Sequence, residues 1–414
     1  MRCMFRVTLA PLLALLMFTP ATARAEILSR HLTQALSIDP VFRTLAAQRE
    51  AAAARGVTVA SPIAGSPVIE GSIRSNTRGP GVSREFEVGG SVPIWLPGQR
   101  EALGGVVTSS LAEIDQRLRL RRLEVAGAVR EAWWQAVRTE RDWRLARDRL
   151  ATARDIQRDQ AARITAGTSA PADDLLARGE VAAAEQALRE ADAAAKASRT
   201  AYSVLTAGGI PTGVLERAVP RRNSDDHPAT DAARASVARA SAQMRLVKAT
   251  PIENPEIGLF GRTEAGAGGS AETTGIRVRI PLATEARNAP RRAEARAGLT
   301  EAEANLAAER RRIDAGIAAA VAARDSARQI AGLARTRLSL ANEQLAIART
   351  AFRSGALSAL DLFRIQQLQL EAARASAEAA TSLGLAESRL NQALGFVPLS
   401  HQPGDRVGAS PSRT

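Results

Sequence analysis

Cysteine, histidine and aromatic residues are scarce in this chain of 414 residues, which has 1 Cys, 3 His, 8 Phe, 4 Trp and 1 Tyr. The single cysteine, Cys3, cannot form a disulfide framework or a Cys-based metal site. The histidines, His31, His227 and His401, are far apart in sequence, which argues against a His-based metal or catalytic site. The sequence also shows no nucleophile–base arrangement and no G-x-x-x-x-G-K-[ST] phosphate loop. We therefore predict that the chain is not an enzyme and holds no cofactor or metal.

Lysine is almost absent too, although the net charge is +13. Lys196 and Lys248 are the only lysines, so arginine supplies nearly all of the positive charge. A basic chain can bind nucleic acid. Acidic residues alternate with basic ones in stretches such as 301–312, however, and aromatic residues for stacking on bases are few. A solvated basic surface is the better interpretation, and we predict no nucleic-acid partner.

The N-terminus has the pattern of a secretory signal peptide. Arg2 and Arg6 precede an apolar run at 7–18, and Ala23-Arg24-Ala25 follows as a cleavage motif. We predict a signal peptide at 1–25 and an exported mature chain that has no cysteine and no lipid anchor. No later segment reaches about 18 consecutive apolar residues, so we expect no transmembrane helix. Such a chain is periplasmic, secreted, or embedded in an outer membrane through β-strands.

The rest of the chain is an internal duplication. At an offset of 188 residues three prolines coincide with prolines: Pro40 with Pro228, Pro67 with Pro255, and Pro93 with Pro281. Several matches in the same order are the signature of repeats. We predict a first repeat at 26–210, a linker at 211–227, a second repeat at 228–398, and a disordered tail at 399–414.

Each repeat has the same predicted order of elements: a helix, two short strands joined by a Gly-rich loop, a very long helix and a closing helix. In the first repeat the helix is expected at 27–58, the strands at 66–75 and 84–95, and the later helices at 99–165 and 172–206. In the second repeat the helix is expected at 229–249, the strands at 255–262 and 272–282, and the later helices at 287–353 and 360–394. The strand loops fall at 75–83 and 263–271.

The short strands have two different faces. In the strand expected at 84–95, Phe86 and Val88 alternate with Glu85 and Glu87. Period-two alternation puts one set on each face, and segments of about ten residues with this pattern are typical of transmembrane β-barrels. Soluble hairpins packed on a core are the alternative. Membrane strands cannot have open edges, so they would require an oligomer, and three copies of four strands could share one closed barrel.

The long helix at 287–353 has apolar residues in two heptad series that lie roughly 140° apart around its axis. The first series is Leu333, Leu340 and Ile347, and the second is Leu338, Leu345 and Phe352. Two seams indicate two neighbouring helices, as in the wall of a tube, whereas a two-stranded coiled coil needs only one. A helix in a wide bundle is the alternative. The Gly, Ser and Asp residues after each long helix by themselves indicate simple helix hairpins.

Together these features resemble the TolC-like outer-membrane efflux factors over about 26–398. The resemblance is carried by strand pairs ending in Val92-Pro93-Ile94 and Ile280-Pro281-Leu282, and by the turns Gly167…Ser169…Asp173-Asp174-Leu175-Leu176 and Gly355…Ser358…Asp361-Leu362. It implies a mainly α, internally duplicated fold, in which a trimeric 12-stranded β-barrel continues into a 12-helix periplasmic α-barrel. The implied partners are two further copies of the chain, outer-membrane lipid, a periplasmic adaptor protein and a proton-driven inner-membrane pump.

The resemblance also assigns candidate site residues. Gly167, Ser169, Gly355 and Ser358 would lie at the tip of the helical tunnel, where the adaptor makes contact. Asp173, Asp174, Asp361 and Arg364 would lie at the tunnel entrance. The family often has an acidic residue where this chain has Arg364, which argues against a strongly cation-selective entrance.

Two segments, Asn254-Pro255-Glu256-Ile257-Gly258 and 280–288, look more like the heavy-metal (cobalt–zinc–cadmium) branch of this family than its drug branch. We therefore expect an outer-membrane exit duct for heavy-metal cations. A multidrug or small-organic duct of the same family is the alternative. A periplasmic coiled-coil scaffold without a pore is a further alternative, and it would be soluble without detergent.

Overall fold

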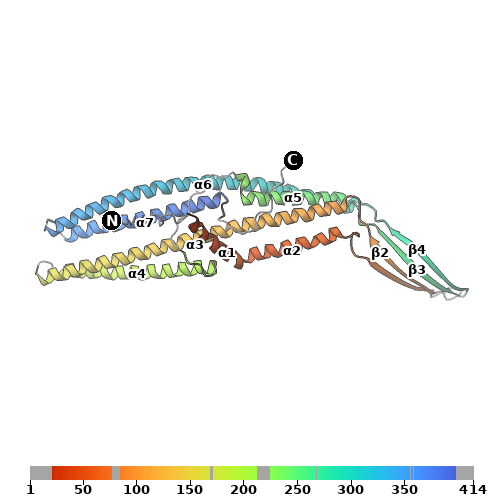
Figure 1. The fold of residues 1–414 in the computed structure, drawn as a ribbon, viewed down its shortest axis with the longest axis horizontal. Helices are drawn as coiled ribbons and strands as arrows, with labels where there is room; N and C mark the ends of the chain where they lie inside the picture. The colour runs from red at the N-terminus through yellow and green to blue at the C-terminus, as the bar shows by residue number, and fades with distance from the viewer. Residues whose placement is uncertain are drawn as a thin grey trace, which may run out of the picture. The chain divides into compact units, whose positions relative to one another are not determined.

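The structure of the chain, a computed structural model, describes residues 21–76, 84–167, 171–211, 224–266, 268–354, 356–357 and 359–397. It is mainly helical with one small antiparallel sheet, which confirms this part of the predicted fold class. The elements are α1 (Ala21–Ile38), α2 (Pro40–Ala60), β1 (Val68–Ser75), β2 (Arg84–Pro93), α3 (Gln99–Thr165), α4 (Pro171–Leu205), the 3₁₀ turn η1 (Ser224–Asp226), α5 (Pro228–Ala249), β3 (Glu256–Gly266), β4 (Gly269–Arg279), α6 (Glu285–Arg353) and α7 (Ala359–Ala393). Figure 1 shows the four strands side by side, and the long helices folding back into shorter ones, α3 into α4 and α6 into α7.

The chain divides into two compact units that cut across the sequence repeats. The first unit comprises Met1–Asp39, Arg122–Arg221 and Gly316–Thr414. The second comprises Pro40–Arg121 and Arg222–Ala315, and it contains the sheet. Each long helix contributes its beginning to the second unit and its end to the first, so each unit combines corresponding parts of both repeats.

The sheet has the strand order β1-β2-β3-β4, and every neighbouring pair is antiparallel. The central β2–β3 pair joins the two repeats, with Arg84 opposite Ala265 at one end and Pro93 opposite Glu256 at the other. The second hairpin corrects one expectation, since its strands continue through most of the loop placed at 263–271. The β-branched Thr263 and Thr273 suit a strand, and the ladder continues to the pair of Gly266 with Gly269. Most of the loop expected at 75–83 lies outside the described residues.

The single helix expected at 27–58 is wrong, because α1 ends at Ile38 and α2 begins at Pro40. Proline has no N–H to donate and its ring disfavours a helical conformation in the preceding residue. Pro40 therefore occupies the first position of a new helix, as its counterpart Pro228 does in α5. In α5 the cap is His227, whose side chain accepts a hydrogen bond from the N–H of Ala229.

In the second unit, ion pairs join helices that flank the sheet connections. The carboxylate of Glu113 on α3 is almost fully buried and is paired with Arg117 of the same helix at 2.7 Å and with Arg239 of α5. Arg49 of α2 pairs with Asp115 of α3 at 2.7 Å. The two arginines offset the cost of burying the Glu113 carboxylate, because an unpaired charge in that position would be strongly unfavourable.

In the first unit, α3 contacts three other helices. His31 of α1, Trp133 of α3 and Tyr202 of α4 form a buried aromatic cluster, with the Trp133 and Tyr202 rings edge to face at 5.7 Å. Trp134, next in α3, donates from Nε1 to Ser388 Oγ of α7 at 2.7 Å. Two neighbouring tryptophans therefore connect α3 both to α4 of its own repeat and to α7 of the other repeat. No helix in the described part of the chain has the length and apolar composition needed to cross a membrane.

Candidate functional site

The sheet of the second unit has one apolar face and one charged face. Residues directly opposite each other in an antiparallel pair lie on the same face, so the register assigns every side chain. One face carries Ile69, Ile73, Phe86, Val88, Val92, Ile257, Leu259, Ile276 and Val278. The other carries Glu70, Arg74, Glu85, Glu87, Glu256, Arg262, Glu264, Arg277 and Arg279.

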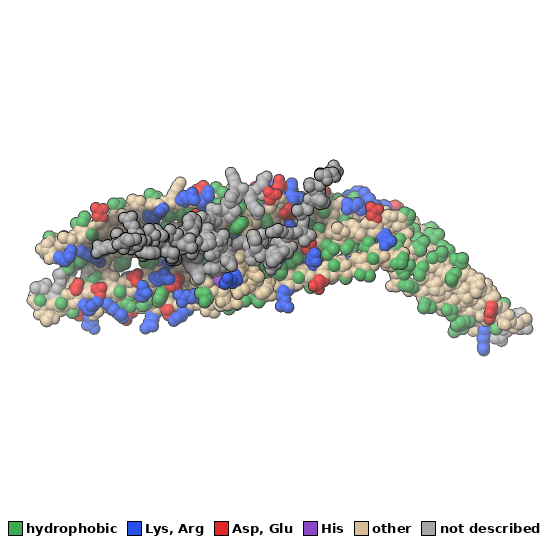
Figure 2. All heavy atoms as spheres, in the orientation of Figure 1, with side chains coloured by type: hydrophobic (Ala, Val, Ile, Leu, Met, Phe, Trp, Pro, Cys, Tyr) green, Lys and Arg blue, Asp and Glu red, His purple; other side chains and the backbone are tan. Residues whose placement is uncertain are grey.

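The apolar face is not covered by other described parts of the chain. Ile69 is 84% exposed, and Leu259 and Ile276 are each 69% exposed. Figure 2 shows hydrophobic side chains gathered over the strand region, with charged ones mainly near its end. A continuous exposed apolar surface on a folded protein marks contact with lipid or with another protein.

On the charged face, the side chain of Glu87 lies at the centre of an ion-pair network. Arg262 donates from Nη2 to Glu87 Oε2 at 2.8 Å, and Arg277 also donates to Glu87. Arg262 further pairs with Glu85 at 3.0 Å, and Arg277 with Glu70 at 3.2 Å. The network thus links all four strands. Alternation in the sequence indicates that these positions are polar, but only the pairing register brings two arginines onto one glutamate.

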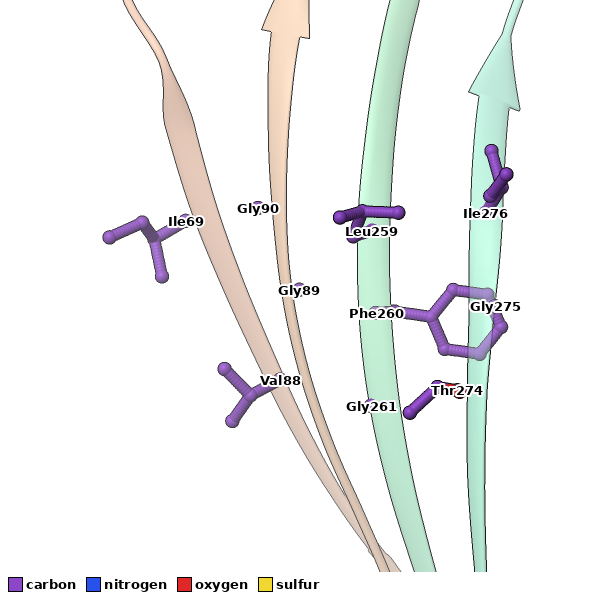
Figure 3. A pocket seen from close by; sticks show the side chains of 10 residues that line it. All are labelled: Ile69, Val88, Gly89, Gly90, Leu259, Phe260, Gly261, Thr274, Gly275 and Ile276. Carbon is purple, nitrogen blue, oxygen red and sulfur yellow. The ribbon is translucent and has the colours of Figure 1, made fainter.

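Glycines allow close approach between strands in this sheet. A Cβ on Gly258 of β3 would lie 2.4 Å from the carbonyl oxygen of Gly90 on β2. A Cβ on Gly275 of β4 would lie 2.6 Å from Cζ of Phe260, and Figure 3 shows the Phe260 ring over Gly275. A shallow hollow crosses the four strands there, lined among others by Ile69, Val88, Leu259 and Ile276 (Figure 3).

In the first unit, the two predicted heptad series of α6 have different surroundings. Leu333, Leu340 and Ile347 are 72%, 62% and 66% exposed. In the second series Leu345 is buried, and Leu338 and Phe352 are partly buried. The second seam therefore packs within the described chain, and the first seam is left on the surface.

Those of the predicted tip and entrance residues that the structure describes lie at or near the turns between the helices of the first unit. Gly167 follows α3 with a positive φ of 71°, and its N–H donates to the carbonyl of Ile164 at 2.9 Å. Asp173 and Asp174 lie in the first turn of α4, and Asp361 in the first turn of α7. Carboxylates there interact favourably with the helix dipole. Three further tip candidates, Ser169, Gly355 and Ser358, lie outside the described residues.

Arg364 contributes to a surface hollow that α4 and α7 form together. Its guanidinium lies 3.9 Å from the carboxylate of Asp361; the Arg364 side chain is largely exposed and that of Asp361 about half exposed. The hollow is lined by Leu176, Glu180, Arg364, Gln367 and Leu368. The structure thus brings the predicted entrance residue Arg364 beside α4, although α4 and α7 belong to different repeats.

The whole architecture matches solved structures of outer-membrane channels. CusC, described as forming a transmembrane channel, matches with a TM-score of 0.72 at 16% identity over 89% of this chain and 92% of its own. The outer-membrane protein VceC from Vibrio cholerae matches with 0.69 at 17% identity, over 89% and 96%. The CmeC outer-membrane channel from Campylobacter jejuni matches with 0.70 at 16% identity, over 89% and 86%. No protein-family model and no curated protein matches the sequence.

The chain therefore has the fold of TolC-like outer-membrane channels. The likeness extends over 89% of the chain, so it is not confined to one of the two repeats. The three TM-scores lie between 0.69 and 0.72, so the fold is shared to a similar degree with each of these structures.

Proposed function

We propose that this protein is the outer-membrane exit duct of a tripartite efflux system. It would pass cargo from a periplasmic adaptor and a proton-driven inner-membrane pump to the exterior, and it would carry out no chemistry of its own. The observation that carries the proposal is the sheet, which presents an exposed apolar face and a charged face within a fold shared with outer-membrane channels.

The sheet supports placement in the outer membrane. Its strands have 8, 10, 11 and 11 residues, so three of the four reach the length of about 9–11 residues that a tilted membrane strand needs, and β1 falls one short. The apolar face would contact lipid and the charged face a water-filled lumen. Unpaired strand edges are not tolerated in lipid, so we propose that three copies close a barrel of 12 strands.

The helical part supports the same assembly. The exposed seam of α6, made of Leu333, Leu340 and Ile347, keeps the spacing of seven residues that knobs-into-holes packing requires. In the proposed trimer this seam packs on a neighbouring copy and the helices form a periplasmic tunnel. Burying it would remove an apolar surface that water otherwise contacts.

We propose that the turns at the ends of α3 and α6 form the periplasmic tip. Gly167, Ser169, Gly355 and Ser358 would contact the adaptor, and Asp173, Asp174, Asp361 and Arg364 would lie at the entrance. The apolar side chains of Leu176 and Leu368, in the hollow beside Arg364, support a protein-contacting role for this region.

Fractionation of wild-type cells and of two arginine variants tests the membrane assignment. Leu259→Arg places a charge on the apolar face, which costs roughly 2–4 kcal/mol at the bilayer midplane. Ser91→Arg, the matched control, places the same charge on the polar face near Glu256. We expect detergent-dependent wild-type trimers, few for Leu259→Arg and near-normal amounts for Ser91→Arg. Extraction of wild-type protein without detergent would instead indicate a soluble scaffold.

We further propose that the cargo is heavy-metal cations, on the basis of the sequence segments 254–258 and 280–288. The test is a gene deletion, complemented by wild type, grown on cobalt, zinc, cadmium, nickel and copper and on a panel of drugs and detergents. Selective sensitivity to metals supports the proposal. Sensitivity to drugs with normal metal tolerance would retain the channel and replace the cargo with small organic molecules.

A further inference from the structure

The two hairpins of the sheet have the same register once the duplication is taken into account. Shifting the β1–β2 pair of Val68 with Ser91 by 188 residues gives Glu256 with Arg279, which is an observed β3–β4 pair. All eight β1–β2 pairs convert in this way into observed β3–β4 pairs. The duplication is therefore exact at the level of strand pairing, although few residues are identical.

The sheet also contains one junction between repeats. At the β2–β3 junction the first repeat pairs with the second, and Ser91 lies opposite Gly258. Within the described chain, β1 and β4 pair on one side only. In a closed ring of copies, the missing junction runs from the second repeat of one copy to the first repeat of the next. That junction is equivalent to β2–β3 if the repeats follow one another regularly around the ring.

We propose that β4 of one copy pairs antiparallel with β1 of the next copy in the register that the duplication predicts. Applying the shift of 188 residues to the pair of Ser91 with Gly258 places Arg279 opposite Glu70 of the next copy. The same register places Arg277 opposite Ser72 and Ile276 opposite Ile73. This inference rests on the proposed trimeric channel and specifies the side chains that join its subunits.

The chemistry of the paired residues fits this register. Arg279 and Glu70 both lie on the charged face and carry opposite charges, and Ile276 and Ile73 both lie on the apolar face. A slip of one residue would put charged side chains on the lipid face. A slip of two in one direction would place Arg277 opposite Arg74. A slip of two in the other direction would place Arg277 opposite Glu70, so experiment has to distinguish that register from the proposed one.

Disulfide cross-linking tests the register directly, because Cys3 is the only cysteine and lies in the predicted signal peptide. One chain would carry both Glu70→Cys and Arg279→Cys, and a second variant would carry Ile73→Cys and Ile276→Cys. Successive pairs in an antiparallel ladder alternate between hydrogen-bonded and non-hydrogen-bonded types, with the side chains closer in the latter. The two variants, three positions apart, sample both types. The second variant also leaves every charge in place, in case the first fails to assemble.

We expect oxidation of detergent-solubilised trimers to give covalent dimers and trimers on a denaturing gel, which a reductant reverses. Single-cysteine variants control for random contact. A bridge within one chain would leave the band at the size of the monomer, so only covalent dimers and trimers count as evidence. Such a bridge is also disfavoured, because three strand spacings are roughly 14 Å, a distance that the long side chains of Arg277 and Glu70 span in one chain but a disulfide, which needs Cα atoms within about 7 Å, does not. The shifted control pair, Glu70→Cys with Arg277→Cys, should link at least several-fold less.

The experiment gives different results if the proposed register is wrong and if the proposed channel function is wrong. Trimers in which the shifted pair links best, or in which neither predicted pair links, overturn the register and leave the proposed function standing. Protein that is soluble and forms no trimers overturns the proposed function and this inference together.

Discussion

Gly258→Ala is the substitution for which the structure predicts the sharpest effect on assembly. The added Cβ would lie 2.4 Å from the Gly90 carbonyl oxygen and 2.9 Å from Cβ of Ser91. The nearest of these atoms is backbone of β2, so it can move only if the β2–β3 pair separates. Gly258 does not have a positive φ, so the effect would come from crowding between strands and not from backbone strain.

Crowding of this kind costs about 1–3 kcal/mol, while replacing glycine by alanine stabilises by about 0.4–1 kcal/mol through the unfolded chain. Because the closest clash is with backbone, we expect a net loss of about 2 kcal/mol per copy. Gly261→Ala in the same strand is the matched control, since nothing lies within 4 Å of its added Cβ. Gly275→Ala should be intermediate, because its Cβ meets the end of the Phe260 ring, which can rotate.

The assay is the temperature at which trimers extracted from membranes dissociate on a denaturing gel, together with the amount of trimer per cell. In the proposed trimer three copies carry each substitution, so the effects per trimer are about three times larger. We expect the order Gly261→Ala, Gly275→Ala, Gly258→Ala from most to least stable. A Gly258→Ala trimer as stable and abundant as the Gly261→Ala trimer would refute the reasoning about strand spacing.

The remaining predictions concern the first unit. Tyr202→Phe removes the hydroxyl that lies 2.8 Å from His31 Nδ1 and should lower stability by about 1–2 kcal/mol; an unchanged melting temperature would contradict this. Burial, with a smaller contribution from Arg30, lowers the pKa of His31 below its usual 6.5. The unfolded chain therefore binds the proton more readily, so stability should be unaffected above about pH 6.5 and fall as the pH drops through the folded pKa. Melting scans from pH 5 to 8 check this, and His31→Gln should flatten the dependence. Asp361→Lys changes a half-exposed side chain at the start of α7, 3.9 Å from Arg364, and should leave trimers assembled but abolish export; normal export would argue against adaptor contact at the tip.

The sequence predicted the order of the helices and strands and most of their limits. The helix expected at 99–165 begins and ends at those residues, and the later helices differ from expectation by one or two. These signals are local: proline and glycine interrupt helices, and the apolar period separates helices from strands. The missed break at Asp39 was also a local signal, since Pro40 disfavours a continuous helix.

Fewer features of the candidate site could be predicted from the sequence. The tip and entrance residues were assigned by resemblance and remain predictions, although the structure places Asp173, Asp174 and Asp361 at helix starts. Sequence patterns marked the charged face of the strands, but they did not reveal that Arg262 and Arg277 converge on Glu87. That arrangement depends on which strands are neighbours and in what register.

By itself, the sequence determined the duplication, the element types and the two faces of each strand, because these depend on residues within a few positions of one another or on a fixed offset. Only the tertiary structure decided which α6 seam packs internally, how compact units combine both repeats, and which charges meet across the sheet. Those features depend on contacts between residues more than a hundred positions apart, such as Glu87 with Arg262. No local pattern encodes such pairings, since they arise only when the chain packs and the strands take one register.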